Sequence, residues 1–149
     1  MAVISEVIVK PTCVCIRCSG TCTSAEEFKR VLLTAIAASQ ESQRIHILID
    51  GADVTGYLSD VDRFEIATYL SELNRQEETY FKAIAIVGNM PLVDPFRFGE
   101  TVARNRGVNG RVFTDIKEAI EWLAMERINM GIQQSSDMDD ELLKTASDS

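Results

Sequence analysis

Two short, almost wholly apolar runs constrain the fold of this 149-residue chain more than any other feature. Residues 45–49 read IHILI and residues 83–87 read AIAIV, and longer segments with helical spacing of apolar residues flank both. Such a run is typical of a strand that is buried on both faces. Burial of both faces occurs mainly in parallel sheets, because their helical crossovers cover the sheet. We therefore expect an α/β fold.

The rest of the chain alternates in the same way and completes the order β-β-α-β-α-β-α-β-α. Residues 7–9 and 13–18, separated by Pro11 and Thr12, predict an antiparallel hairpin at one edge. The other strands alternate with helices and should pair in parallel through right-handed crossovers. The prediction is a mixed, mostly parallel sheet covered by about four helices, the first over residues 25–38. Residues predicted to bound the helices are Ser24, Ser59 or Asp60, Asp94 with Pro95, Gly107, and Thr114 or Asp115.

The charge balance excludes several classes of protein. The chain has 23 acidic and 15 basic residues and a net charge of −8, so we expect no nucleic-acid binding. No apolar run approaches the ~18 residues that a membrane span needs, so we expect no membrane insertion. The start, MAVISEVIVKPT, lacks the basic and long apolar regions of a signal peptide. We therefore expect a cytoplasmic protein.

The acidic charge is concentrated at one end. Residues 131–149 hold five acidic side chains against one lysine and have few large apolar groups. Such a segment buries too little surface to offset its ordering entropy. We predict one domain over residues 1–130 and a disordered tail over residues 131–149; a docking peptide for a basic partner is the alternative.

Polar residues follow two of the predicted parallel strands, in loops over residues 50–59 and 88–94. Ligands bind at the carboxyl ends of strands in open α/β sheets, and the helix N-termini that follow favour anions. Neighbouring strands would bring the two loops together. The alternative is that these side chains only cap turns and helices. The candidate rim residues are Asp50, Asp53, Thr55, Tyr57, Ser59 and Asn89.

Apolar residues lie beside the same loops. Met90, Phe96, Phe98 and Tyr57 should surround the mouth of this crevice, where they would suit an apolar ligand. Ordinary core packing is the other interpretation.

Four cysteines fall within ten residues, at Cys13, Cys15, Cys18 and Cys22. Alternation places the first two on one face of a strand and Cys18 on the other, with Cys22 past a turn. Four sulfurs on a regular strand cannot converge on one tetrahedral ion, so we predict thiols and neither a metal nor a cofactor. The single histidine, His46, lies in an apolar strand and is expected to be a core residue rather than a base.

The one local basic grouping comprises Arg97, Arg104, Arg106 and Arg111. It could receive a phosphate, an acidic partner or the chain's own acidic tail. A solvated helix face is the simpler interpretation.

Three segments carry a resemblance to a known family. ILIDGADVTGYLSDVDRFEIATYL resembles the strand–loop–helix of the STAS family, the anti-sigma-factor antagonist fold. AIAIVGN and RVFTDIKEAIEWL are similar to the later elements of the small bacterial SpoIIAA-like (STAS/SEC14-type) proteins, so that the resemblance spans residues 3–125. It implies a mixed sheet with helices, an architecture shared with CRAL-TRIO lipid-binding domains. It also implies protein interaction or ligand sensing rather than catalysis.

The resemblance also bears on phosphorylation. Phospho-switched STAS members carry Asp-Ser-Ser-Gly where this chain has Leu58-Ser59-Asp60-Val61. Ser59 is thus a candidate phosphorylation site at the first serine position, and Asp60 stands where the phosphoserine would be. Asp60 could mimic a fixed negative charge or cap the helix, and we favour the cap.

Together these observations predict a non-enzymatic regulatory or protein-interaction module of the STAS-like type. Recognition would centre on residues 50–59 and the following helix, with Asp60, Asn89 and Met90 nearby. The partner would be an unknown protein or a second copy of the chain. The alternative is a carrier or sensor of a small apolar, lipid-like ligand. A hydrolase or transferase that uses Asp50 or Asp53 is a third hypothesis, for which no nucleophile–base pair is visible.

Overall fold

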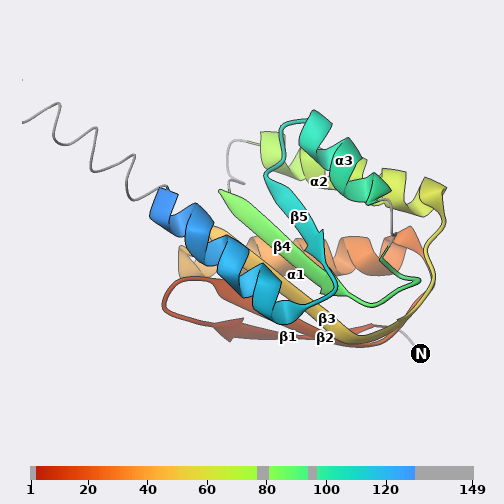
Figure 1. Ribbon diagram of the computed structural model, residues 1–149, viewed down its shortest axis with the longest axis horizontal. Helices are drawn as coiled ribbons and strands as arrows, with labels where there is room; N and C mark the ends of the chain where they lie inside the picture. Colours follow the sequence, from red (N-terminus) through yellow and green to blue (C-terminus); the bar gives the residue numbers. More distant parts are fainter. Residues whose placement is uncertain (1–2, 77–80, 94–96, 130–149) are drawn as a thin grey trace, which may run out of the picture.

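The computed structural model describes residues 3–76, 81–93 and 97–129, and its centre is a five-stranded sheet with the order β1-β2-β3-β4-β5 (Figure 1). Residues 116–129 form a further helix after β5. The predictions for Asp94, Pro95, Phe96 and the tail at 131–149 fall outside the described residues. The elements are β1 (Ile4–Val9), β2 (Val14–Cys22), α1 (Ala25–Ser42), β3 (His46–Gly56), α2 (Asp60–Arg75), β4 (Ala83–Gly88), α3 (Phe98–Asn105) and β5 (Gly110–Phe113).

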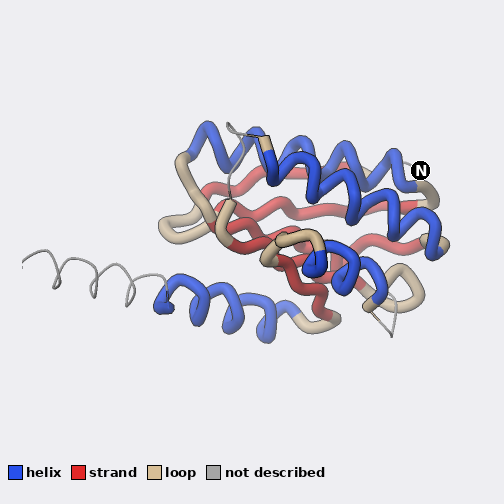
Figure 2. Tube along the Cα trace, turned by 90° about the horizontal axis from the view of Figure 1, so that it is seen from above, coloured by secondary structure: helices blue, strands red, loops and turns tan. Residues whose placement is uncertain are grey.

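The sheet is mixed and mostly parallel, as predicted. β1 pairs with β2 antiparallel, and the three remaining pairs are parallel. Each crossover moves one strand further in the same direction, so α1, α2 and α3 pack on one face of the sheet. The helix at 116–129 packs on the opposite face, below the strands in Figure 2. The fold is therefore three layers: helices, sheet, and one helix.

Burial on both faces of the central strands is confirmed. Ile47 and Ile49 pack in the larger core against α1, α2 and α3, and Leu48 between them packs in the smaller core under the last helix. None of the three is more than 2% exposed. Phe113 and Trp122 contact each other with ring centroids 5.9 Å apart, which docks the last helix on β5.

The prediction of a loop over residues 50–59 is wrong for most of that range, because residues 50–56 belong to strand β3. β3 continues to Gly56 because β2 also continues, to Cys22, and the two extensions pair in parallel. The register shifts between Arg17 and Ser19, which is the signature of a bulge. This shift turns Val54 to the same face as Ile49, five residues earlier, and buries it.

Gly56 ends the extension for a steric reason. Its φ is +130°, and a Cβ there would lie 1.9 Å from the carbonyl oxygen of Cys22. Only glycine fits such a position. The turn after Gly56 leads the chain from β3 into α2.

The cysteines divide between the two faces of β2. Cys15 lies in the core under the last helix and Cys18 in the core under α1, as alternation predicts. Cys22 is not past a turn, because it is the last residue of β2 and shares the face of Cys18.

Candidate functional site

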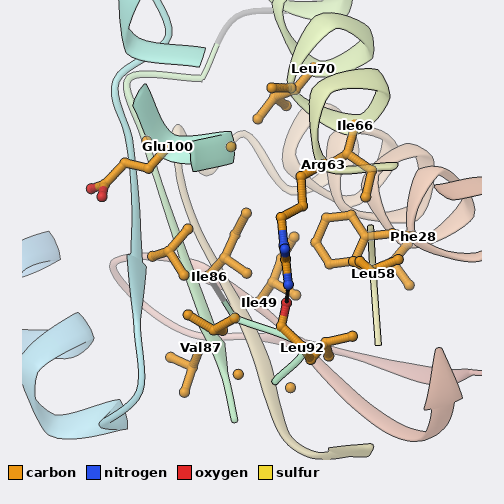
Figure 3. Close-up of a pocket in the computed structure, with 18 of the residues that line it drawn as sticks. Phe28, Ile49, Leu58, Arg63, Ile66, Leu70, Ile86, Val87, Leu92 and Glu100 are labelled. Carbon is orange, nitrogen blue, oxygen red and sulfur yellow. Dashed lines mark hydrogen bonds between the residues drawn. The ribbon is translucent and has the colours of Figure 1, made fainter. Parts of the chain in front are cut away.

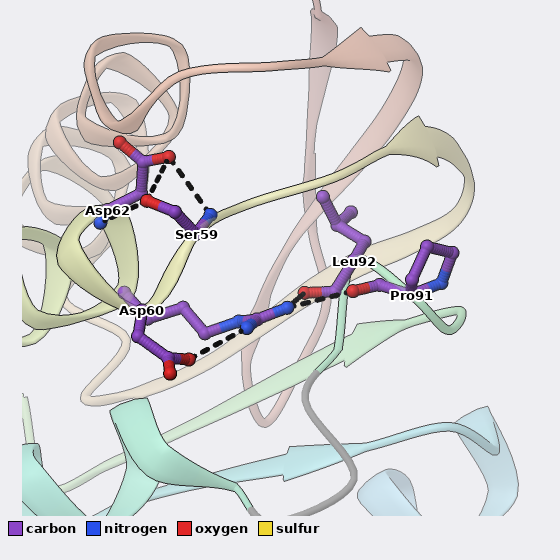
Figure 4. A network of polar contacts seen from close by, with 6 residues as sticks. Ser59, Asp60, Asp62, Pro91 and Leu92 are labelled. Carbon is purple, nitrogen blue, oxygen red and sulfur yellow. Dashed lines mark hydrogen bonds and ion pairs between the residues drawn. The ribbon is translucent and has the colours of Figure 1, made fainter.

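Ser59 begins the helix at the end of the β3 extension. Its Oγ accepts a hydrogen bond from the Asp62 amide at 3.1 Å and donates one to the Asp62 carboxylate at 2.9 Å, while the Ser59 amide donates to the same carboxylate oxygen at 3.1 Å (Figure 4). This reciprocal capping box satisfies two amides that an uncapped helix would leave open. The favoured prediction that Asp60 is the cap is wrong: Asp60 is the first residue of α2, and Ser59 is the N-cap.

Arg63 joins the first turn of α2 to the loop after β4. One terminal nitrogen, Nη1, lies 3.2 Å from the Asp60 carboxylate, and the other, Nη2, donates to the carbonyl oxygens of Pro91 at 2.8 Å and Leu92 at 3.2 Å (Figure 4). Sequence reasoning missed this residue. Its only signal was the i,i+3 spacing from Asp60, which many exposed helix faces share.

The candidate rim residues are only partly brought together. Asn89 donates from Nδ2 to the carbonyl oxygen of Ala52 at 2.6 Å, so the loop after β4 does meet β3, as predicted. Thr55 lies 3.3 Å from the Thr21 hydroxyl on β2, oxygen to oxygen. Asp50 pairs with Val87 in the sheet and follows Leu48 by two residues, so it lies on the face of the last helix, away from Ser59.

Asp50 and Asp53 lie on the extended part of β3. The Asp50 carboxylate accepts a hydrogen bond from the Ala52 amide at 3.1 Å, which is a local turn-like contact, and Asp53 is an exposed strand residue. Within the described ranges, no group of three or more His, Cys, Asp or Glu side chains is placed to hold a metal ion. In the same ranges no helix combines the length and the apolar character required to cross a membrane.

Exposed apolar side chains gather at the start of α2. Tyr57 is 60% exposed, Val61 68% and Phe64 43%; we call these three residues the α2 patch. The guanidinium of Arg63 lies 5.8 Å from the centre of the Tyr57 ring, and that of Arg106 lies 5.4 Å from the Phe64 ring. Stacked cations of this kind hold aromatic rings in place at a surface.

An apolar cavity of about 120 Å³ lies between the sheet and α1, α2 and α3. Arg63 projects from α2 among the apolar side chains that line the cavity, and its guanidinium reaches the Leu92 carbonyl on the opposite side of the cavity (Figure 3). The predicted mouth residues Tyr57 and Met90 are about 60% exposed and face solvent. Apolar residues that line the cavity include Phe28, Ile49, Leu58, Ile66, Ile86 and Leu92.

Three further charged residues border the cavity near α3 and β5. Glu100 has a side chain only 9% exposed, with its carboxylate 3.8 Å from Arg97 Nη1 and 3.5 Å from Arg111 Nε. The predicted basic grouping is therefore divided. Arg97 and Arg111 flank Glu100, Arg106 stacks on Phe64, and Arg104 is exposed.

Burial controls the titration of the thiols and of the histidine. It raises the pKa of Cys18 to about 11, and a smaller effect of the nearby Asp50 acts in the same direction. Burial also lowers the pKa of His46, which is 4% exposed and whose Nε2 has no hydrogen-bond partner in the described part of the chain. These groups are neutral at pH 7 and belong to the core, as predicted for His46.

Comparison with known proteins agrees with the observed fold. The SpoIIAA-like family matches residues 13–124. A crystal structure of an anti-sigma factor antagonist from Mycobacterium paratuberculosis is similar, with a TM-score of 0.52 and 16% identity, over 83% of this chain and 95% of that one. An uncharacterized DUF3478-family protein with a SpoIIAA-like fold from Shewanella loihica also matches, with a TM-score of 0.45 and 18% identity, over 82% and 94% of the two chains. No curated protein matches.

Proposed function

Because this chain belongs to the SpoIIAA-like family, we propose that it is a regulatory protein-interaction module that acts by binding and not by catalysis. The structurally similar protein from Mycobacterium is an anti-sigma factor antagonist. By analogy, the partner proposed here is another regulatory protein. Recognition is proposed to centre on the C-terminal end of β3 and the start of α2.

The observation that carries this proposal is the α2 patch. Val61 and Phe64 are exposed on the first two turns of α2, and Tyr57 is exposed two residues before its N-cap. Exposed apolar groups gathered in this way mark contact surfaces. Arg63 holds the loop with Met90, itself 59% exposed, against the same end of α2. A partner would therefore meet a surface whose backbone is already ordered, which reduces the entropy lost on binding.

Ser59 is proposed as the point at which this surface is modulated. A phosphate on its Oγ would remove the hydrogen bond that the hydroxyl donates to Asp62 and would stand beside the Asp60 and Asp62 carboxylates. The helix N-terminus favours the added charge, whereas the two carboxylates oppose it. We expect Ser59→Glu to weaken partner binding while the domain stays folded.

Cross-linking in cell extract followed by mass spectrometry tests the interaction. Val61→Asp places a charge in the centre of the α2 patch and should abolish capture of a specific protein. Leu33→Asp is the matched control, because Leu33 is 49% exposed on α1, outside the patch. Equal capture of the same protein by the wild type and both variants would refute recognition through α2.

A second function is favoured by a different observation. The apolar cavity under α1, α2 and α3 is consistent with a carrier or sensor of a small apolar ligand. Native mass spectrometry of freshly purified protein tests this function. Retained non-covalent mass that is lost on denaturation is the expected result. A bare chain mass, with no stabilisation by any small apolar compound, would remove this function and leave the first in place.

A further inference from the structure

We propose that the cavity binds a small carboxylate with an apolar body of about four to six carbon atoms, and that Arg63 binds the carboxylate group. This inference rests on the second proposed function, ligand binding in the cavity. It adds the chemical class of the ligand, its size and the residue that recognises it.

The size follows from the volume. A dry cavity of about 150 Å³ lined by aliphatic and aromatic side chains holds a benzene molecule. The cavity here is slightly smaller, about 120 Å³, and its lining is similar. It therefore accepts a short acyl chain or a single six-membered ring and is too small for the chain of a membrane lipid.

The charged end of the ligand follows from Arg63. Its side chain is only 12% exposed, and two of its three nitrogens contact Asp60, Pro91 and Leu92. The third nitrogen, Nε, is buried and makes no hydrogen bond to any described residue. A buried N–H without an acceptor is unfavourable, and a carboxylate oxygen within the cavity would supply that acceptor.

The charge around the cavity selects an anion. Three arginines and one glutamate are among the lining residues, so the lining is positive although the whole chain has a net charge of −8. Glu100 already lies between Arg97 and Arg111, and its carboxylate points away from Arg63 (Figure 3). Arg63 is therefore left as the cation that faces the apolar space. Asp60 offsets it weakly, because the Asp60 side chain is 75% exposed to water.

The number of free hydrogen-bond donors in the cavity favours a carboxylate over a doubly charged group. Arg63 offers one N–H without a hydrogen bond, its Nε, and this single donor matches a single negative charge. A phosphate would bring nearly two charges into an apolar space where the other guanidinium N–H without a hydrogen bond among the described residues, Arg111 Nε, already faces the Glu100 carboxylate at 3.5 Å.

Two isosteric probes test the proposal on the wild-type protein. Hexanoate and hexanamide have the same carbon chain and differ in charge. Calorimetry at pH 7 and constant ionic strength should show hexanoate binding at least about tenfold more tightly, because hydrogen bonds to charged groups are the stronger ones. Methyl shifts of Ile49 and Ile86 should move with either ligand, since both residues line the cavity. Decanoate should bind more weakly than hexanoate.

Three variants locate the recognition. Arg63→Gln should weaken hexanoate binding about tenfold or more and change hexanamide binding less than about twofold. Arg104→Gln is the control for loss of a positive charge on an exposed helix face and should change neither. Ala67→Leu puts three carbons into the cavity from α2 and should abolish binding of both probes.

The outcomes separate this inference from the function on which it rests. Equal affinity for hexanoate and hexanamide would overturn recognition by Arg63 but leave ligand binding in the cavity intact. No binding of either probe or of longer acyl compounds would overturn both. Methyl shifts confined to residues outside the cavity would also overturn the inference. If Arg63→Gln fails to fold, the ratio of the wild-type affinities and the Ala67→Leu result still decide.

Discussion

Removal of the Ser59 hydroxyl tests whether this residue acts as the helix cap that the structure shows. In Ser59→Ala, the Asp62 amide loses its acceptor at 3.1 Å and the Asp62 carboxylate loses the hydroxyl donor at 2.9 Å. The bond from the Ser59 amide to Asp62 can remain, because it does not use the hydroxyl. Loss of a serine cap typically lowers the free energy of unfolding by about 1 kcal/mol. The site is half-buried, so solvent replaces only part of the lost contacts, and we expect about that value.

Ser59→Asn is the matched variant, since asparagine caps helices as well as serine does. For a domain of this size, 1 kcal/mol corresponds to a fall in Tm of about 2–4 °C. Urea unfolding followed by circular dichroism should show that fall in stability for Ser59→Ala and less than half of it for Ser59→Asn. A double-mutant cycle with Asp62→Ala should give a coupling of about 0.5 kcal/mol or more, because the two side chains contact each other.

Two results would refute the reasoning. If Ser59→Ala is as stable as the wild type, the capping box contributes nothing in solution. If alanine and asparagine are equally destabilising, the effect does not arise from the cap. In either case the proposed effect of a phosphate on Ser59 would lose its structural basis.

Other predictions concern the end of β3 and the two cores. In urea titration, Gly56→Ala should lower the free energy of unfolding by at least about 2 kcal/mol, because φ is positive there and the new Cβ meets a backbone oxygen. Gly107→Ala is the control. Its φ is also positive but no atom lies within 4 Å of the new Cβ, so the loss should be only about 1 kcal/mol. Equal losses would contradict the steric argument. Burial lowers the pKa of His46 in the folded protein, so its contribution to stability is complete above the unfolded value of about 6.5 and decreases as the pH falls below it. His46→Leu should therefore lose less stability than the wild type between pH 7 and pH 5, and identical pH profiles would argue against a buried neutral imidazole. Iodoacetamide at pH 8 should modify Cys13 first in the intact protein, because the other three thiols are buried and the pKa of Cys18 is raised to about 11. Mass spectrometry of samples taken over time measures the order of modification. Rapid labelling of all four without denaturant would contradict the packing of β2.

Local patterns were sufficient for the architecture. The apolar runs at residues 45–49 and 83–87 predict strands buried on both faces, and the sheet places them as its central parallel pair. The alternation of the cysteines likewise predicts the opposite faces of Cys15 and Cys18. These features follow from backbone periodicity, which each segment carries by itself.

The extension of β3 depends on pairing between segments far apart in the chain. Residues 50–56 contain two aspartates and two glycines, which local propensity assigns to a loop. Pairing with the far end of β2 overrides that propensity, and a register shift alters which side chains face the core. Asp50 consequently lies on one face of the sheet and Ser59 leads into a helix on the other.

The sequence by itself determined the order of the elements and the mixed sheet. It narrowed the cap at the start of α2 to Ser59 or Asp60, and the structure decided for Ser59. Only the tertiary structure showed the role of Arg63 and the cavity beside it. The arginine bonds to carbonyl oxygens 28 and 29 residues further along the chain, and the cavity is bounded by three helices and the sheet. Neither feature has a local periodicity, because both arise where separate elements meet.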